Sequence, residues 1–181
     1  MQVDLSSYTN SWYKPGGPFR RIFWYYINLC VFRTGCLPVY SLKRALLRMF
    51  GAKIGKGVLI KPHVNIKYPW LLSIGDHSWI GEDVWIDNLA HVEIGAHCCL
   101  SQGAFILTGN HDFTKSTFNL IVKPITIARG AWIGAKSIVC PGVDAGEHSV
   151  LTAGSVATQN LEPFGIYRGN PAEKVKMRHI H

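Results

Sequence analysis

The chain has 181 residues, of which 48% are hydrophobic, and a formal net charge of +8 with a sequence pI near 9.4. This length favours one domain, or one domain with a terminal extension, and the apolar content is sufficient for a continuous core. The positive charge indicates an anionic partner, which is a nucleotide cofactor, nucleic acid or anionic lipid. The five cysteines form no C-x-x-C pair and are odd in number, so we expect a reduced, cytosolic protein without a disulfide framework.

The first eighteen residues predict an irregular lead-in rather than a helix or a secretion signal. They are polar and interrupted by Gly and Pro, so they lack the apolar run of a signal peptide. The apolar run at residues 22–32 has about eleven residues, whereas a helix needs about twenty to cross a bilayer. We therefore expect no membrane-spanning helix here.

Residues 19–50 predict two helices that are interrupted around Gly35 and Pro38. The second helix is expected to begin near Ser41. Its polar face is expected to carry three cations, namely Lys43, Arg44 and Arg48.

We expect residues 1–50 to form an N-terminal helical cap segment, and a second role is open for part of it. The terminal coils of a repeat fold need a cover, and this segment would supply one. Alternatively, residues 20–33 would make a peripheral membrane contact, because arginines flank a Trp/Tyr/Phe-rich stretch of the kind found at a headgroup boundary.

From residue 51 onward the chain follows a six-residue repeat. An aliphatic or small residue returns at each repeat, and a small or β-branched residue follows it four places later, as at Ser78, Ala90 and Cys98. The step is six within a group of three repeats and eight between groups, so that the groups start twenty residues apart. The first positions of the repeats are Ile54, Ile60, Ile66, Ile74, Ile80, Ile86, Ile94, Leu100, Ile106, Ile127, Ile133, Val139, Ala145, Leu151 and Ala157. Units this short bury their apolar face only when they stack.

The repeat predicts an all-β fold over residues 51–160. Three repeats per turn give a triangular cross-section with one short parallel strand on each side, and about five coils. A glycine often follows the aliphatic residue, which fits a corner with positive φ. An ordinary β-sandwich also shows alternating strands, but it has no reason to keep one register on both sides of an insertion.

The repeat is interrupted at residues 107–126, where we expect an inserted loop that stands off one corner. Insertions in repeat proteins gather on the working face. His111 lies in this insert, and imidazole is the side chain best matched to take and return a proton near neutral pH. An isolated loop histidine is more often structural, but the surrounding repeats favour a chemical role for His111. The repeat histidines share one offset and are interpreted as corner residues that face water, namely His63, His77, His97 and His148.

Several segments together resemble the hexapeptide-repeat acyltransferases. They are the repeats, the insert Thr108-Gly-Asn-His-Asp-Phe, the Pro141-Gly-Val turn and the closing Gly169-Asn-Pro-Ala. The stretches Leu46-Leu-Arg-Met-Phe-Gly-Ala-Lys-Ile-Gly and Tyr68-Pro-Trp are similar to the colanic acid biosynthesis type of O-acetyltransferase, which is related to maltose, galactoside and nodulation acetyltransferases. The resemblance implies a left-handed parallel β-helix, whereas the spacing alone leaves the hand open.

The resemblance also implies an activity, which is acetyl-CoA-dependent O-acetylation of a sugar hydroxyl in exopolysaccharide or surface-glycan biosynthesis. The expected protein is a cytoplasmic homotrimer that holds acetyl-CoA between neighbouring solenoids and a sugar or glycan acceptor at the insert. His111 matches the catalytic histidine and would act as general base, in a direct transfer that needs no acyl-enzyme and no metal.

Further site residues follow from the same resemblance. Acceptor-side candidates are Asp87, Asn88 and Asn110. The candidates for the cofactor are small residues along the pantetheine arm and cations near the nucleotide phosphates, namely Gly134, Ala135, Ala153, Gly154, Thr158, Lys174, Lys176 and Arg178. The cations lie in residues 161–181, which are expected to form a short C-terminal extension.

Other functions stay open on the sequence. An N-acetyltransferase for an amino sugar or amino acid would use the same base. A γ-class carbonic anhydrase shares the solenoid but needs three histidines around a metal, and Ser116 stands five places after His111. A non-catalytic solenoid would have no use for a histidine in an insert, and nucleic-acid binding is favoured by charge alone.

Overall fold

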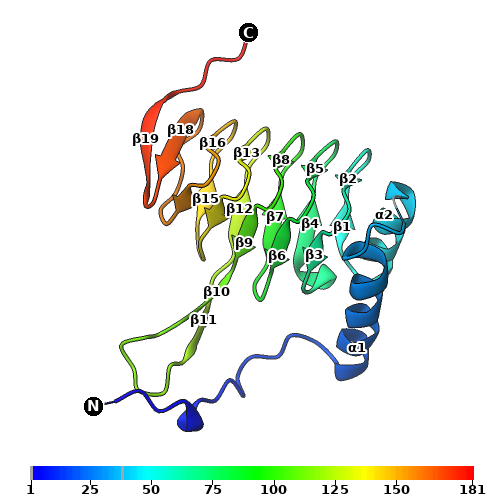
Figure 1. Ribbon diagram of the computed structural model, residues 1–181, viewed down its shortest axis with the longest axis vertical. Helices are drawn as coiled ribbons and strands as arrows, with labels where there is room; N and C mark the ends of the chain where they lie inside the picture. The colour runs from blue at the N-terminus through cyan, green and yellow to red at the C-terminus, as the bar shows by residue number, and fades with distance from the viewer. Residues whose placement is uncertain (1, 38) are drawn as a thin grey trace.

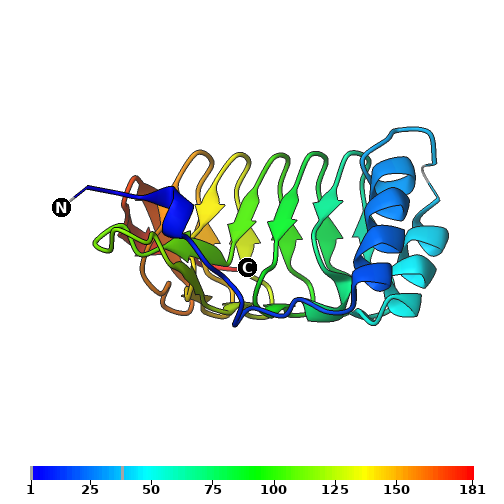
Figure 2. The same ribbon diagram turned by 90° about the horizontal axis from the view of Figure 1, so that it is seen from below.

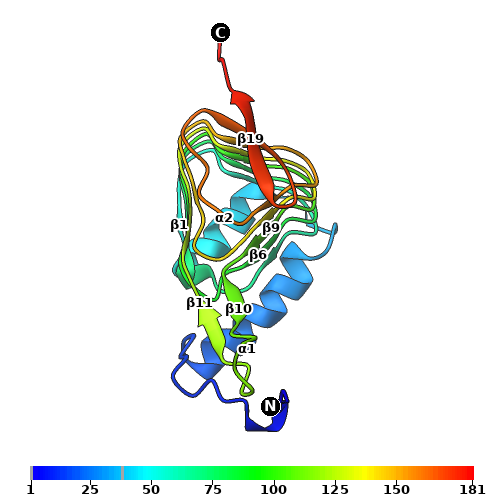
Figure 3. The same cartoon turned by 90° about the vertical axis from the view of Figure 1, so that its left-hand side faces the viewer.

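The computed structural model describes residues 2–37 and 39–181, so Pro38, part of the predicted helix break, lies outside the described residues. Short parallel strands coil around one core, and two N-terminal helices lie across the end where the solenoid starts (Figure 1). Seen along the stack, the coils superimpose in a roughly triangular outline (Figure 3).

Three parallel sheets form the three faces of the solenoid. The first face consists of β1 (Lys53–Ile54), β4 (Leu72–Ile74), β7 (Val92–Ile94), β12 (Ile125–Ile127) and β15 (Asp144–Ala145). The second face consists of β2 (Leu59–Ile60), β5 (Trp79–Ile80), β8 (Cys99–Leu100), β13 (Trp132–Ile133), β16 (Val150–Leu151), β18 (Gly165–Gly169) and the antiparallel β19 (Ala172–Met177). The third face consists of β3 (Asn65–Ile66), β6 (Trp85–Asp87), β9 (Phe105–Leu107), β14 (Ile138–Val139) and β17 (Val156–Ala157).

The solenoid has about six turns rather than the expected five. Five coils are complete, and the bridge from Leu161 to Ala145 begins another, which continues into β18. This coil starts only four residues after Ala157, whereas the sequence repeat predicted a step of six or eight. The shortened corner hid the last coil from the repeat count.

The predicted repeat positions form the core. None of the fifteen first positions exposes more than 8% of its surface. Most residues four places later are also buried, but Trp70 and Ala90 are half-buried and Asn110, in the insert, is exposed. The side chains inside the triangle are therefore those that the six-residue register selects.

The glycines next to the core positions have a different role from the one expected. Their φ angles are not positive. Instead, a Cβ atom added to Gly75 would lie 2.5 Å from the backbone nitrogen of Ala96 in the next coil, and one on Gly134 would lie 2.5 Å from that of Ala153. Positive φ occurs two residues later in the repeat, as at His77 (57°) and His97 (58°). Histidine is one of the few residues that adopt this conformation readily.

Two helices cover the first coil. They are α1 (Pro18–Ile27), which continues as the π-helix η2 (Asn28–Phe32), and α2 (Tyr40–Met49). The N-cap of α2 is Val39 and its first residue is Tyr40, next to Ser41, near which the sequence predicted its start. Among the described residues, no helix has the length and apolar character needed to span a bilayer.

The cations of α2 contact the solenoid, although the sequence pattern assigned them to a polar outer face. Lys43 is fully buried and donates to the carbonyl oxygens of Ile60 and Lys61, at 3.3 and 3.0 Å. Arg44 and Arg48 donate to other carbonyls of the same coil, with distances of 2.7 to 3.0 Å. These carbonyls have no preceding coil to bond with, so the cations satisfy acceptors that would otherwise be orphaned.

The insert forms the antiparallel hairpin β10 (Gly109–His111) and β11 (Leu120–Val122), which projects from the corner between the third and first faces (Figure 1). The N-terminal residues contain the single turn η1 (Leu5–Ser7) and pass along the solenoid from α1 to this hairpin (Figure 2). The expected projecting insert is thus present, and the lead-in packs beside it.

Candidate active site

Thr108 anchors the base of the hairpin. Its side chain is buried, and Oγ1 donates to the carbonyl oxygen of Asp87 at 2.9 Å while accepting from the N–H of Ala90 at 3.0 Å. On the return strand, the N–H of Lys123 donates to the Thr108 carbonyl at 3.0 Å. The hairpin therefore leaves the solenoid from a fixed point, three residues before His111.

His111 is held in one tautomer. Its Nδ1 atom lies 2.8 Å from the carbonyl oxygen of Phe118, at the far end of the hairpin. A carbonyl oxygen only accepts hydrogen bonds, so Nδ1 carries the proton, and in the neutral ring the lone pair is on Nε2. The geometry leaves Nε2 as the atom that can take a proton.

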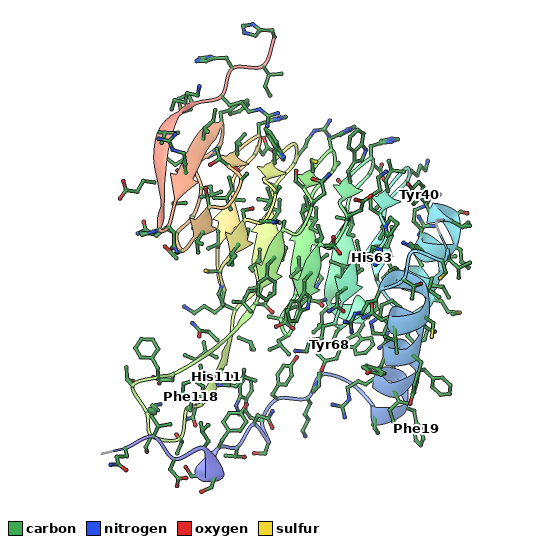
Figure 4. All side chains as sticks on the ribbon, in the orientation of Figure 1. Phe19, Tyr40, His63, Tyr68, His111 and Phe118 are labelled. Carbon is green, nitrogen blue, oxygen red and sulfur yellow. The ribbon has the colours of Figure 1, made fainter. Side chains whose placement is uncertain are left out.

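Aromatic rings fix the plane of the imidazole. The Phe118 ring stacks on His111 with centroids 4.4 Å apart and an interplanar angle of 9° (Figure 4). Phe118 also has a positive φ of 49°, which is unusual for a bulky residue and lets its carbonyl and ring both face the histidine. A second ring, that of Tyr8 from the N-terminal segment, lies 5.7 Å from His111. Sequence reasoning missed both neighbours, because neither has a motif of its own.

The acidic residue beside His111 serves the loop. Asp112 accepts hydrogen bonds from the N–H and the hydroxyl of Thr114, at 3.1 and 2.6 Å. The Thr114 hydroxyl is the main cause that lowers the pKa of Asp112 below its usual value. The carboxylate stabilises the turn that follows the histidine.

The three acceptor-side candidates lie in different surroundings. Asn110 is exposed, and its Oδ1 accepts from the backbone N–H of His111 at 2.8 Å. Asp87 ends β6 and forms an ion pair of 2.8 Å with Lys67. Asn88 is fully buried, where its amide bonds to both backbone groups of Tyr68, at 2.6 and 3.0 Å. A sugar contact by any of these side chains stays a prediction.

A cavity of about 600 Å³ lies between α1 and the third face, beside Asp87. Aromatic and aliphatic side chains form much of its wall, including Ile22, Tyr25, Tyr26, Tyr68 and Trp85. Three cations also line it, namely Arg21, Arg33 and Lys67. The cavity is therefore both apolar and positively charged.

The cofactor candidates divide between the corners of one chain. The small residues meet at the corner between the second and third faces, where the N–H of Gly154 donates to the Ala135 carbonyl at 2.8 Å. Gly134 and Ala153 belong to the same corner, and Thr158 is exposed just after β17.

The C-terminal cations lie elsewhere. Arg178 donates to the carbonyls of Gly130 and His148, at 3.1 and 3.2 Å, at the corner between the first and second faces. Lys174 pairs with Glu162, and Lys176 is exposed on β19. One chain alone thus does not bring these cations to the small residues or to His111. In the part of the chain that the structure describes, no three His, Cys, Asp or Glu side chains are grouped as a metal site.

Known proteins with similar sequences are acetyltransferases. No family model matches the chain. It is 36% identical over 176 residues to WcaF, a candidate colanic acid biosynthesis acetyltransferase of Escherichia coli K12, and the match spans 97% of each protein. Galactoside O-acetyltransferase of the same strain is 26% identical over 137 residues, which cover 74% of this chain and 68% of that protein.

Solved structures agree with the sequence relatives. A hexapeptide-repeat containing acetyltransferase from Vibrio cholerae matches with a TM-score of 0.80 and 25% identity, over 88% of this chain and 90% of that one. That Vibrio protein is also known in complex with acetyl-CoA. The fold is the left-handed parallel β-helix of these proteins.

Proposed function

The chain belongs to the hexapeptide-repeat acetyltransferases, beside the colanic acid biosynthesis type, and on that premise we propose that it transfers the acetyl group of acetyl-CoA to a sugar hydroxyl with His111 as general base. The observation that carries the proposal is the bond from Nδ1 of His111 to the Phe118 carbonyl. It leaves Nε2 unprotonated on a hairpin that a rigid solenoid holds outward.

The reaction begins when Nε2 takes the proton of the sugar hydroxyl as that oxygen attacks the thioester carbonyl. The tetrahedral intermediate then collapses, the carbon–sulfur bond breaks, and the imidazolium returns the proton to the departing thiolate. The Phe118 carbonyl keeps its hydrogen bond from Nδ1–H throughout and so holds the ring in place. A positioned base of this kind contributes roughly 10² to 10⁴ in rate.

Direct transfer without an acyl-enzyme fits the surroundings of the core cysteine. Burial raises the pKa of the Cys98 thiol, which disfavours the thiolate needed for nucleophilic attack. Its Sγ lies 3.0 Å from the carbonyl oxygen of Ala128, inside the coil. Cys98 therefore acts as a small core residue.

We further propose a homotrimer, because two outer faces are apolar and one is polar. The second face presents Leu59, Trp79, Cys99 and Trp132. The third face presents Trp85, Phe105, Ile138 and Val156, and its first outward residue, Asn65, is bonded to Asn28 of η2. The first face presents Lys53, Ser73, Glu93, Thr126 and Asp144. A ring of three identical chains joins two different patches of each chain, and the two apolar faces supply them.

The trimer would also complete the site. The small cofactor candidates and the His111 hairpin lie at different corners of one chain, so acetyl-CoA in the groove between two solenoids would meet the hairpin of one and the small residues of the other. Light scattering tests the assembly. We expect Trp132→Glu to give monomers and Thr126→Glu, on the polar face, to leave the trimer intact; a trimeric Trp132→Glu protein would oppose this arrangement.

The acceptor is proposed to be a glycan precursor that the enzyme modifies in the cytoplasm, with a peripheral membrane contact through residues 20–33. Helix α1 exposes Phe19 by 77%, Phe23 by 65% and Tyr26 by 60%, and Tyr26 also lines the cavity with its cations. Such a combination suits an anionic headgroup layer. Sedimentation with vesicles of anionic phospholipid tests it, and failure to sediment at low salt would count against the contact.

A thiol-release assay tests the proposed activity. Acetyl-CoA is combined with methyl β-galactoside, methyl α-glucoside, methyl α-mannoside or glucosamine, the last as an arm for N-acetylation. We expect His111→Ala to lower kcat at least about a hundredfold with little change in acetyl-CoA binding. His97→Ala is the matched control, since His97 stacks on His77 at a corner. Unchanged turnover in His111→Ala, or no thiol release from any acceptor, would remove the basis of the proposal.

A further inference from the structure

The N-terminal segment is tied to the hairpin region at both of its ends. The backbone N–H of Asp4 donates to the carbonyl oxygen of Ser116, near the tip of the hairpin, at 2.9 Å. The hydroxyl of Tyr13 donates to the carbonyl oxygen of Leu89, near the hairpin base, at 2.7 Å. Residues 4–13 therefore lie alongside the whole hairpin, although more than a hundred residues separate Asp4 from His111 in the chain.

A capped turn sets the direction of the side chain that reaches His111. Asp4 accepts from the N–H and the hydroxyl of Ser6, at 3.0 and 2.6 Å, and these bonds lower the pKa of the Asp4 carboxyl. The Ser7 hydroxyl donates to the Asp4 carbonyl at 2.7 Å. Tyr8 follows directly as the C-cap of η1, with its N–H bonded to Leu5. The side chains of the turn itself stabilise it, and the turn places the Tyr8 ring beside His111.

That ring contacts the imidazole in a different manner from Phe118. Phe118 lies flat on His111, whereas Tyr8 is tilted by 58° with a centroid distance of 5.7 Å. A flat stack covers one face of the imidazole. A tilted ring at the larger distance stands at the margin of the imidazole and leaves part of its own surface uncovered, in keeping with the half-buried state of Tyr8.

We propose that residues 4–13 form a wall of the acceptor site and that the Tyr8 ring is a specificity-determining platform for the sugar ring. This inference rests on the proposed function. Binding sites for small ligands are lined mainly by aromatic and apolar side chains, with few polar groups that fix orientation. A pyranose has apolar C–H faces that pack on an aromatic ring, so a ring beside the general base would orient one hydroxyl toward Nε2.

Kinetics separate this role from a simple support of His111. With the methyl glycosides above, we expect Tyr8→Ala to raise the acceptor KM at least about tenfold and to narrow the ratios of kcat/KM among the three sugars. The acetyl-CoA KM should stay within about twofold. Tyr8→Phe keeps the platform and should restore the acceptor KM, and Asp4→Ala, which frees the turn, should raise it in the same direction.

Phe113→Ala is the matched control, because Phe113 is an aromatic residue of the same insert but is 77% exposed. Its kinetics should equal those of the unmodified enzyme. A uniform fall in kcat for Tyr8→Ala on every sugar, with unchanged acceptor KM, would show a support role and overturn the inference. The outcome is independent of the His111→Ala assay, since a wrong role for Tyr8 leaves the loss of turnover in His111→Ala intact.

Discussion

Thr108 gives a quantitative test of how the solenoid holds the proposed general base, His111. Thr108→Val keeps the volume and the β-branched shape of the side chain but removes the hydroxyl, whose two hydrogen bonds join the hairpin base to Asp87 and Ala90. The Asp87 carbonyl keeps other donors, including the N–H of Leu89 at 3.2 Å. The N–H of Ala90 loses its acceptor.

The expected cost follows from these two bonds. An N–H group left without a partner in a buried site costs about 1 to 3 kcal/mol, and the lost bond to Asp87 adds about 0.5 to 1.5 kcal/mol. Ala90 is half-buried, so the first value is about halved and the total is about 1 to 3 kcal/mol. For a chain of this length, each kcal/mol lowers Tm by about 2 to 4 °C.

Thermal unfolding and steady-state kinetics measure the two consequences. Thr108→Ser keeps both hydrogen bonds and is the matched control, so it should lose only the contribution of one methyl group, about 1 kcal/mol. With Thr108→Val we also expect kcat to fall while acetyl-CoA binding persists, because the hairpin moves and the small-residue corner does not. A Thr108→Val protein as stable and as active as Thr108→Ser would refute this account of the anchor.

Two further predictions test the coil geometry and the cap. Gly75→Ala should lower the free energy of unfolding in urea by about 3 kcal/mol, because its Cβ would lie 2.5 Å from the backbone of the next coil. Gly103→Asn should lower it by less than about 1 kcal/mol, because Gly103 has a positive φ that Asn tolerates and no atom lies nearer than 3.4 Å to the added Cβ. Equal losses would contradict the two roles of glycine. Burial lowers the pKa of Lys43 in the folded protein from its ordinary value of 10.5. Between the lowered pKa and about 10.5, Lys43 is protonated in the unfolded chain but not in the folded protein, so the free energy of unfolding should rise with pH over this window. Lys43→Met should lack this rise, and parallel pH curves for the two proteins would refute it.

The core was predictable from the sequence because the register repeats. Each position such as Ile80 or Leu100 has the same neighbours one coil before and after, so a single spacing fixes its burial. The last coil was not predicted, because its start at Leu161 breaks that spacing. The glycine prediction was wrong for a related reason. A close approach between coils and a positive φ both favour glycine, and only coordinates tell which constraint acts at Gly75 and which at Gly103.

Contacts between distant segments were harder to predict. The helix pattern predicts that Lys43 is a surface cation, yet Lys43 donates to carbonyls of the first coil. The pattern of the helix alone does not tell where that coil lies. Tyr8 lies in a stretch without periodicity and still reaches His111. The insert sequence singled out the histidine, whereas the rings and carbonyl that surround it depend on how the hairpin folds.

The segment from α1 to the hairpin also constrains how such proteins can change length. Each added coil lengthens a stack of parallel strands by about 4.8 Å. A coil added before β9 would carry the hairpin away from α1 and pull on the bonds that Asp4 and Tyr13 make, whereas a coil added after β12 would leave them untouched. The N-terminal residues thus fix the number of coils between α1 and the hairpin. We expect coils to be added or lost without loss of stability on the C-terminal side of the insert, and to destabilise the protein on its N-terminal side.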